Sequence, residues 1–477
     1  MRINLTVKAG PHEGEVFEFQ ERAFFVVGRS ERANFRLPVK DNSISRIHFM
    51  IEMNPPQCRL TDMDSTNGTR VNGQKVAMAD LKDGDLITAG KTILLVSVID
   101  SDEPLVSTTE TILTSGAAAF DAPLQPGPHA VPTAAPSGQP LSTVDYPSRP
   151  RPDEKAPRSC RLCGDSLAET EIGATSSGGQ NTNVEAISLC PACQGRIGNH
   201  PQPIPGYQVV RELGRGGMGV VYQALRTADG GLVALKTIQP AVDPTPVEID
   251  RFLREAQILS ELDHPNIVSF HELGESGGLL YFAMDYVAGT DAAHLLKQHR
   301  GPLPIARAVD LVCQLLRALD YAHAKGFVHL DVKPANMLVT QEGGRDVVRL
   351  SDFGLARIYL TSKMSGLSTN DECGGTAPFM APEQINDLRA TKPPADQYSA
   401  AATLYNLLTD RFIYDFPKKL HAKIMKILLE DPVPIRDRRP DLPEGLAAII
   451  HRALTRDPQA RYPNVRKMRR ALLPFAK

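Results

Sequence analysis

The sequence predicts a multidomain fold made of an all-β sandwich, a small four-cysteine module and an α+β unit built in two parts. Short apolar segments separated by turn dipeptides fill residues 1–100, and two C-x-x-C pairs lie within 159–194. Over 207–477, strand-like segments come first and amphipathic helices follow. A chain of 477 residues is long enough for two or three domains, and its 42% hydrophobic fraction is enough for packed cores.

Charge and hydropathy argue against several classes of function. A formal net charge of −2, with no basic patch near the cysteines, gives no reason to expect a nucleic-acid partner. No run approaches the roughly 18 apolar residues of a membrane-spanning helix. Residues 1–10 alternate like a strand and lack the apolar core of a signal peptide. We therefore expect no membrane span and a cytoplasmic location.

Residues 1–100 are predicted to form the sandwich. Apolar alternation in segments such as INLTVKA and KTILLVSVI indicates strands, and NG and DG dipeptides between segments indicate tight turns. Arg29, Ser45 and Thr66 fall in or beside the predicted loops. An arginine offers a fork of donors to phosphate, and hydroxyl groups add neutral donors, so these loops suit an anionic ligand.

Residues 101–158 are predicted to be a flexible linker, because their composition shifts to Pro, Ala, Ser and Thr without periodicity. Three threonines, Thr108, Thr109 and Thr111, lie in a mildly acidic part of this linker. Threonine-rich linkers are usually only solvated, which is the alternative to any binding role for them.

Two cysteine pairs bound the predicted module at 159–194. The predicted ligands are Cys160, Cys163, Cys190 and Cys193. Each C-x-x-C turn brings two thiolates toward one point, and four thiolates in a closed tetrahedron suit structural zinc. The interval between the pairs is longer than in a usual zinc ribbon. Two disulfides, or two pairs without a metal, are the alternatives, although a reducing cytosol disfavours disulfides.

The α+β unit opens with a glycine-dense turn. Gly214, Gly216 and Gly219 make G-x-G-x-x-G, a spacing that simple tight hairpins also show. A dinucleotide-binding fold needs a helix directly after these glycines, whereas this sequence continues as a hairpin. A glycine hairpin lets backbone N–H groups close over phosphate groups.

Lys236 lies among apolar residues in the strand-like segment VALK. The next segment begins a helix near Pro246 and carries Glu255 at the edge of its apolar stripe. Burying an unpaired carboxylate is costly, so we expect Lys236 to pair with Glu255. The alternative is a local pair with Arg251, which would contribute only a few tenths of a kcal/mol.

Three further motifs follow in order: HLDVKPANML, LSDFGLAR and GGTAPFMAPEQ, at 329–338, 350–357 and 374–384. With the glycine turn and the lysine, they resemble the protein kinase superfamily, specifically bacterial serine/threonine kinases of the eukaryotic type, over about 207–470. The resemblance implies a bilobal α+β fold, with ATP and magnesium as cofactors. It also implies transfer of the ATP γ-phosphate to Ser/Thr hydroxyls of protein substrates.

The resemblance also implies a role for each matched residue. Asp331 would orient the acceptor hydroxyl, Lys333 would neutralise charge on the group in transfer, and Lys236, fixed by Glu255, would hold the α- and β-phosphates. Magnesium prefers oxygen ligands, and its expected ligands are Asn336 and Asp352. The expected adenine slot and phosphate flap comprise Leu213, Gly214, Gly216, Gly219, Val221 and Ala234.

The lower part of the unit matches the kinase family at two further positions and departs from it at position 330. Asp396 and Arg461 match, and the family implies an ion pair between Arg461 and Glu383. Leu330 stands where the family has an arginine that clamps a phosphorylated activation segment. Since the residues assigned to the chemistry remain, we expect activity that does not depend on this clamp. The alternative is a catalytically weak pseudokinase that acts as a phospho-dependent signalling scaffold.

The N-terminal motifs resemble a forkhead-associated (FHA) domain over about 1–98. The resemblance implies binding of phosphothreonine peptides, with Arg29 and Ser45 on the phosphate and Thr66 assisting. Asn67 would hold the peptide backbone. A sandwich that binds no ligand is the alternative.

His48, three residues after Ser45, is expected to brace the phosphate loop and not to contact ligand. A candidate ligand lies within the chain, because Thr109 has the aliphatic Ile112 three residues further on. We therefore hypothesise that the FHA-like domain captures the linker threonines, once phosphorylated, in the same chain or in a neighbour.

Overall fold

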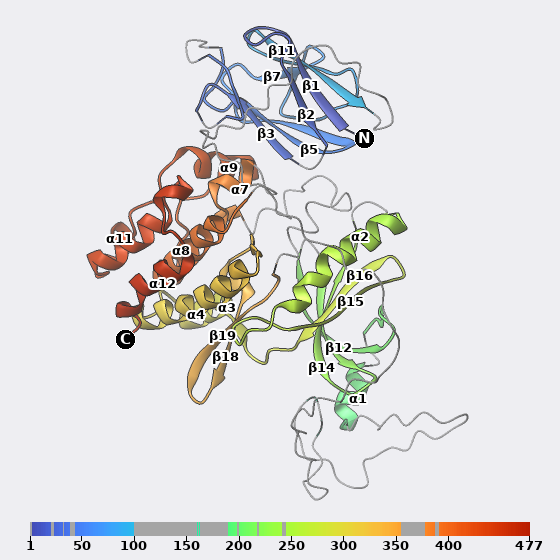
Figure 1. The fold of residues 1–477 in the computed structure, drawn as a ribbon, viewed down its shortest axis with the longest axis vertical. Helices are drawn as coiled ribbons and strands as arrows, with labels where there is room; N and C mark the ends of the chain where they lie inside the picture. Colours follow the sequence, from blue (N-terminus) through green and yellow to red (C-terminus); the bar gives the residue numbers. More distant parts are fainter. Residues whose placement is uncertain are drawn as a thin grey trace, which may run out of the picture.

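The computed structural model describes residues 2–20, 23–31, 33–38, 43–99, 160, 162, 189–197, 200–216, 219–240, 245–353, 377–386 and 391–477. These form an N-terminal body and a larger C-terminal body (Figure 1). No helix in the described part of the chain is long and apolar enough to span a membrane. The predicted linker at 101–158 lies outside the described residues, so its predicted flexibility stays a prediction.

The N-terminal body is a sandwich of two sheets, as the sequence predicts. One sheet has the order β2-β1-β11-β10-β7-β8 and the other β4-β3-β5-β6-β9. The first contains β1 (Arg2–Ala9), β2 (Val16–Phe19), β7 (Thr69–Val71), β8 (Gln74–Val76), β10 (Leu86–Ala89) and β11 (Thr92–Ile99). The second contains β3 (Ala23–Gly28), β4 (Phe35–Arg36), β5 (Phe49–Asn54), β6 (Gln57–Asp62) and β9 (Met78–Asp80).

Strands β3 and β5 each carry apolar side chains on both faces. Phe25, Val27 and Ile51 point into the sandwich core. Side chains alternate between the faces of a strand, so Val26 and Met50 point the other way. These two are cross-strand partners, 0% and 6% exposed, and they belong to the hydrophobic core of the C-terminal body.

The C-terminal body begins with an upper lobe built on a five-stranded antiparallel sheet of order β12-β13-β14-β16-β15. Its elements are β12 (Tyr207–Gly216), β13 (Gly219–Arg226), β14 (Leu232–Ile238), α2 (Pro246–Gln257), η2 (Ile258–Glu261), β15 (Phe270–Ser276) and β16 (Leu279–Asp285). Helix α2 begins at Pro246, as predicted, and buries Phe252 and Ala256 in the core.

The segment before this sheet lies along its edge strand β12. Helix α1 (Pro191–Ile197) contacts β12, and Cys160, Leu189 and Cys193 pack with Val210 and Leu225 in one small cluster. The cysteine-bearing segments are therefore attached to the upper lobe.

A glutamine side chain covers part of the same edge. The amide oxygen of Gln202 accepts the N–H of Val209 at 2.7 Å. Its amide nitrogen donates to the carbonyl of Val209 at 3.2 Å. One side chain thus satisfies both backbone groups of an edge residue.

The lower lobe is mainly helical. Its elements are β17 (Thr290–Asp291), α3 (Ala292–His299), α4 (Ile305–Ala324), η3 (Pro334–Asn336), β18 (Met337–Glu342), β19 (Arg345–Leu350), η5 (Ala377–Phe379), α7 (Pro382–Asn386), α8 (Pro394–Thr409), α9 (Leu420–Leu429), α10 (Ile435–Arg438), α11 (Glu444–Ala453), η6 (Pro458–Ala460), α12 (Val465–Leu472) and η7 (Leu473–Phe475). Helix α8 is buried along almost its whole length and contacts α4, α11 and α12. The predicted order of strands followed by helices is confirmed.

An ion pair closes the lower lobe where the sequence predicts it. The guanidinium of Arg461 donates to both carboxylate oxygens of Glu383, at 2.6 and 2.9 Å. It also donates to the carbonyls of Thr455 and Pro394. The Arg461 side chain is 0% exposed, and these acceptors offset the cost of burying its charge.

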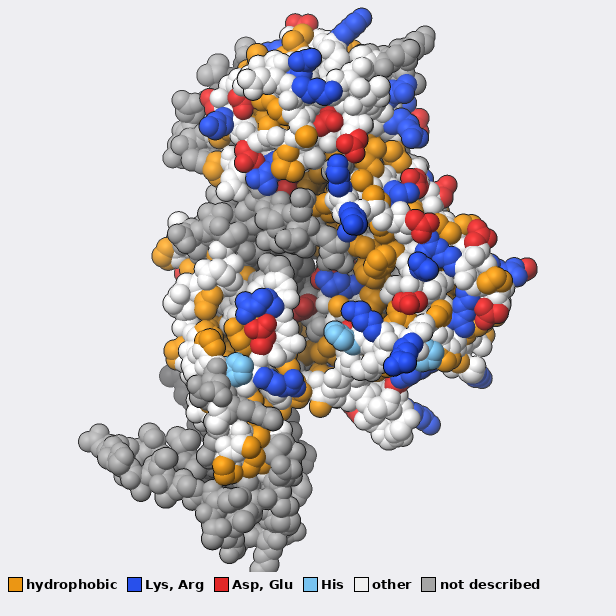
Figure 2. Space-filling model, turned by 180° about the vertical axis from the view of Figure 1, so that it is seen from behind, with side chains coloured by type: hydrophobic (Ala, Val, Ile, Leu, Met, Phe, Trp, Pro, Cys, Tyr) orange, Lys and Arg blue, Asp and Glu red, His pale blue; other side chains and the backbone are white. Residues whose placement is uncertain are grey.

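The sandwich rests on the lower lobe. Strand β3 contacts helix α7, and Figure 1 shows this sheet next to α7 and α9. Ile47 and Met63, 1% and 3% exposed, join Val26 and Met50 in the core of the C-terminal body. Figure 2 shows orange hydrophobic side chains where the two bodies meet, with charges of both signs interspersed over the drawn face.

Candidate active site and phosphate-binding loops

The loop before η3, together with η3 itself, brings three predicted residues together. The Asp331 carboxylate accepts from Nζ of Lys333, at 3.0 Å on Oδ1 and 2.9 Å on Oδ2. Nδ2 of Asn336 donates to the Asp331 carbonyl at 2.8 Å and to its Oδ2 at 3.0 Å. Asp331 is 9% exposed, so a positioned carboxylate lies just beneath the surface.

Helix α8 fixes the backbone of this loop from below. Leu330 has φ of +65°, a conformation that non-glycine residues rarely adopt. The buried carboxylate of Asp396 accepts the N–H groups of His329 and Leu330, each at 2.8 Å. Gln384 donates to the Leu330 carbonyl at 2.9 Å. These bonds hold the unusual conformation that aims Asp331.

The negative charge of the buried Asp396 carboxylate is well compensated. Burial by itself raises the pKa of Asp396, but the hydrogen bond from His323 at 2.8 Å and the nearby His329 outweigh it. The net pKa of Asp396 is below its usual value. The Asp396 carboxylate therefore stays ionised at neutral pH.

Lys236 meets the lower lobe directly. Its Nζ lies 2.8 Å from Oδ1 of Asp352, and Lys236 is 8% exposed. Burial alone raises the pKa of Asp352, but the ammonium of Lys236 outweighs burial and the net pKa is lowered. The backbone of Glu255 belongs to α2, but its side chain lies outside the description, so the predicted Lys236–Glu255 pair stays a prediction.

Further hydrogen bonds hold the segments of the two predicted metal ligands, Asn336 and Asp352, side by side. Ser351, which precedes Asp352, donates its N–H to the Asn336 carbonyl at 2.9 Å. The Nε2 of His329 bonds to the Ser351 carbonyl at 2.9 Å, and the His329 ring packs edge-on against Phe353. Because the amide nitrogen of Asn336 is used on Asp331, its oxygen remains for a cation.

The glycine hairpin is the turn between β12 and β13. Gly216 pairs with Gly219, whose φ is +148°. A Cβ on Gly219 would lie 1.9 Å from the Thr237 carbonyl oxygen, so only glycine fits there. A Cβ on Gly214 or Gly216 would meet no described atom within 4 Å, which leaves space over their backbone. The other predicted slot residues lie on β12, β13 and β14: Leu213, Val221 and Ala234.

In the sandwich, three loops bring the residues predicted to bind phosphate close to one another. The N–H of Arg29 donates to the Ser45 carbonyl at 3.2 Å. The Oγ of Ser45 accepts the Thr66 N–H at 3.0 Å and lies 3.3 Å from the Thr66 hydroxyl. Asn67 donates from its side chain to the Ser43 carbonyl at 2.9 Å. The structure thus brings Arg29, Ser45 and Thr66 together.

Two buried groups support these loops. His48, 0% exposed, accepts the Ser45 N–H at 3.1 Å and bonds to the Gly68 carbonyl at 3.4 Å, as a bracing residue should. Asp62 accepts from Ser65 and Thr69, each hydroxyl at 2.6 Å. Our sequence reasoning missed Asp62, although an aspartate three residues before a serine in a turn is a signal of such capping.

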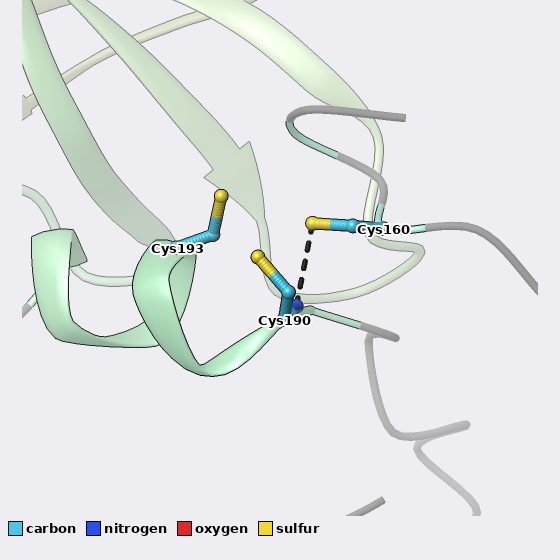
Figure 3. Close-up of side chains that lie close together, drawn as sticks. All are labelled: Cys160, Cys190 and Cys193. Atoms are coloured by element: carbon cyan, nitrogen blue, oxygen red, sulfur yellow. Dashed lines mark hydrogen bonds between the residues drawn. The ribbon is translucent and has the colours of Figure 1, made fainter. Parts of the chain in front are cut away.

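Three of the four predicted zinc ligands converge (Figure 3). The sulfur atoms of Cys160, Cys190 and Cys193 lie within 4.8 Å of one another. The N–H of Cys190 donates to the sulfur of Cys160 at 3.3 Å. Zn–S bonds of about 2.3 Å in a tetrahedron place sulfurs about 3.8 Å apart, so the spacing fits such a site. Cys163 lies outside the described residues.

Comparison with known families decides the class of the C-terminal body. A family model described as a protein kinase domain matches residues 207–471, more than half of the chain. The chain belongs to the protein kinase family. A second model, described as an FHA domain, matches residues 25–90. Both resemblances that the motifs predict are therefore confirmed.

Named relatives of the chain are bacterial serine/threonine-protein kinases. PknH of Mycobacterium bovis is 36% identical over 275 residues, which cover 57% of this chain and 44% of that protein. PknF of Mycobacterium tuberculosis is 37% identical over 56% of each chain. The probable PknB of Lactococcus lactis is 32% identical over 55% of this chain and 40% of its own length. The chain thus spans about half the length of these relatives.

A solved structure is also similar. The crystal structure of the Mycobacterium tuberculosis PknI kinase domain is 31% identical in sequence and has a TM-score of 0.46. The match covers 58% of this chain and 100% of that one.

Proposed function

We propose that this chain is an ATP- and magnesium-dependent protein kinase that phosphorylates serine and threonine in proteins. The observation that carries this proposal is the joined set of Asp331, Lys333 and Asn336, with Asp352 in the adjoining segment and Lys236 of β14 paired with it. Phosphoryl transfer needs mostly positioning and charge neutralisation, and this set supplies both.

Different residues of the chain act on the acceptor hydroxyl of the substrate and on the phosphates of ATP. Asp331 is held by Lys333 and Asn336, so its carboxylate can accept a hydrogen bond from a substrate hydroxyl and then its proton. Lys333 neutralises negative charge between acceptor and donor. Lys236 exchanges Asp352 for the phosphates of ATP, beneath the hairpin that carries Gly216.

Asn336 and Asp352 fit magnesium by the chemistry of their donors. An amide oxygen and a carboxylate are hard ligands of the kind that magnesium prefers. When bound, the metal ion would neutralise charge on the β- and γ-phosphates. The lowered pKa of Asp352 keeps this carboxylate ionised for that role.

The test is a comparison of the full chain with its Asp331→Asn variant after incubation with ATP, magnesium and a generic Ser/Thr protein substrate. We expect the variant to lose about 10²–10⁴-fold in rate, because a positioned proton acceptor is removed. Asp437→Asn, an exposed change on α10, is the matched control and should keep the wild-type rate. A wild-type chain that transfers no phosphate would favour the scaffold alternative.

We propose that the FHA domain recognises phosphothreonine, supported by the convergence of Arg29, Ser45 and Thr66. A peptide of residues 104–116 phosphorylated at Thr109 is the probe for the linker hypothesis. We expect Asp331→Asn full chain to bind it about 10–100-fold more tightly than the unphosphorylated peptide, since charged hydrogen bonds contribute about 1.5–3 kcal/mol. Arg29→Gln should abolish the difference. Equal binding of both peptides would end the linker hypothesis.

We also propose that Cys160, Cys163, Cys190 and Cys193 hold one structural zinc ion. The convergence of three sulfurs and the N–H donated to Cys160 support this, because backbone N–H groups stabilise metal-bound thiolates. Such a site needs reduced thiols, which fits the proposed cytoplasmic location.

A further inference from the structure

The face by which the FHA domain meets the kinase domain includes residues beside its phosphate loops. Val26 and Met50 form the centre of this face. Ile47 lies two residues after Ser45, and Met63 lies three residues before Thr66. Burial of Ile47 and Met63 in the kinase core cluster places the bases of both loops at the lower lobe.

The kinase element under this face lies just beyond the activation segment. Strand β3 contacts α7, and Arg29 directly follows the last residue of β3. Residues 354–376, outside the description, connect Phe353 to Ala377, five residues before α7 begins. This connection contains Thr369, eight residues before Ala377, the first residue of the buried turn η5. An extended chain of eight residues can span up to about 28 Å, which is most of the roughly 35 Å diameter of a domain of about 100 residues.

The kinase domain lacks a cation at its own phosphate-clamp position. Leu330, 5% exposed, packs in the apolar core where the family has an arginine. In contrast, Nε of Arg29 is buried and has no hydrogen-bond partner within the described part of the chain. A buried guanidinium nitrogen without an acceptor is costly, and an anionic ligand would remove that cost.

We propose that the FHA domain captures the activation segment of its own chain, with phosphorylated Thr369 bound by Arg29, Ser45 and Thr66. The arginine missing at position 330 is thus replaced by one from another domain. In the modifying step, the Thr369 hydroxyl oxygen bonds to the γ-phosphorus of ATP as the bond to the β-bridging oxygen breaks. ADP leaves, and the hydroxyl proton passes to Asp331 of the acting kinase domain. This inference rests on the proposed phosphothreonine recognition.

Internal capture has a measurable consequence for external ligands. A tethered ligand on a short linker has an effective concentration of about 1 mM. An external phosphopeptide with micromolar affinity for the same site must then bind about 10²–10³-fold more weakly. The readout is peptide binding and does not depend on catalytic rate.

The experiment uses the full chain with Asp331→Asn, so that no uncontrolled phosphorylation occurs, with phosphothreonine incorporated at 369. The probe is a fluorescent peptide of residues 364–374 phosphorylated at Thr369. We expect tight binding to the unmodified chain and at least tenfold weaker binding to the chain phosphorylated at 369. Phosphothreonine at 361 is the matched control and should leave probe affinity unchanged. Met50→Ser, which weakens the contact between the FHA and kinase domains, should restore part of the affinity of the phosphorylated chain for the probe.

The outcomes separate this inference from the proposed recognition of phosphothreonine. Equal binding of the probe to both chains overturns internal capture and leaves that recognition standing. If the unmodified chain does not bind the probe, internal capture is also overturned. The phosphorylated 104–116 peptide then decides the other question: its binding preserves phosphothreonine recognition, and its failure to bind counts against both.

Discussion

Leu330 is an apolar side chain in a backbone conformation that favours glycine, directly beside the proposed catalytic carboxylate. Its N–H and carbonyl are both bonded, to Asp396 and Gln384. The loop that aims Asp331 is therefore held through its backbone and through a helix below it, and not through the side chain at 330. An arginine at this position is not needed for the geometry of the loop.

We accordingly expect kinase activity without phosphate on the activation segment. A variant with alanine at all five candidate acceptors should keep at least about a third of the wild-type peptide phosphorylation rate, a cost within 1 kcal/mol. These acceptors are Thr361, Ser362, Ser365, Ser368 and Thr369. Loss of nearly all activity would contradict the expectation. Asp396→Asn is the positive control, since removing a buried paired charge should lower both activity and stability, the latter by about 3 kcal/mol.

Individual site residues were predictable where a motif fixes their spacing. Asp331, Lys333 and Asn336 lie within six residues, and a short turn brings them together, as the motif predicts. The contact between Lys236 and Asp352 was not predicted. It joins two residues 116 positions apart and depends on how closely the lobes approach, which no local pattern encodes.

Among the elements, β3 and β5 show a signal that was present in the sequence and was not used. FFVV and FMI are continuous apolar runs, and such runs indicate strands buried on both faces. We interpreted these segments only as strands of the sandwich. The structure places Val26 and Met50 on the second face, covered by the kinase domain.

The cysteine module was predictable as a cluster, because C-x-x-C turns have local geometry. That it packs on β12 was not, since the contact depends on tertiary structure. Its metal content is a prediction: elemental analysis should find about one zinc per chain, as expected for four thiolates. Cys190→Ser combined with Cys193→Ser should lose it.

Cys58→Ala is the control for this measurement. Burial raises the pKa of the Cys58 thiol to about 12, so Cys58 is not a thiolate at neutral pH and its loss should leave the zinc content unchanged. Wild-type protein without zinc, or double variant that retains it, would contradict the zinc proposal.

The molecule as a whole joins two bodies that the sequence predicts separately. Each body has its own motif set, so its family could be predicted from the chain alone. Their mutual placement could not, because it depends on which outer surfaces match in shape and polarity. The apolar patch around Val26 and Met50 supplies that match. The FHA domain is therefore packed against the kinase domain and is not only connected to it by the chain.

The amide of Gln202 has an effect beyond the one residue of β12 to which it bonds. An outermost strand with open N–H and C=O groups is a template on which a second polypeptide can extend the sheet, the usual start of aggregation. Here one side chain occupies both groups of Val209, and α1 lies alongside. A second copy of this protein therefore cannot extend the sheet at Val209 unless the Gln202 side chain is displaced.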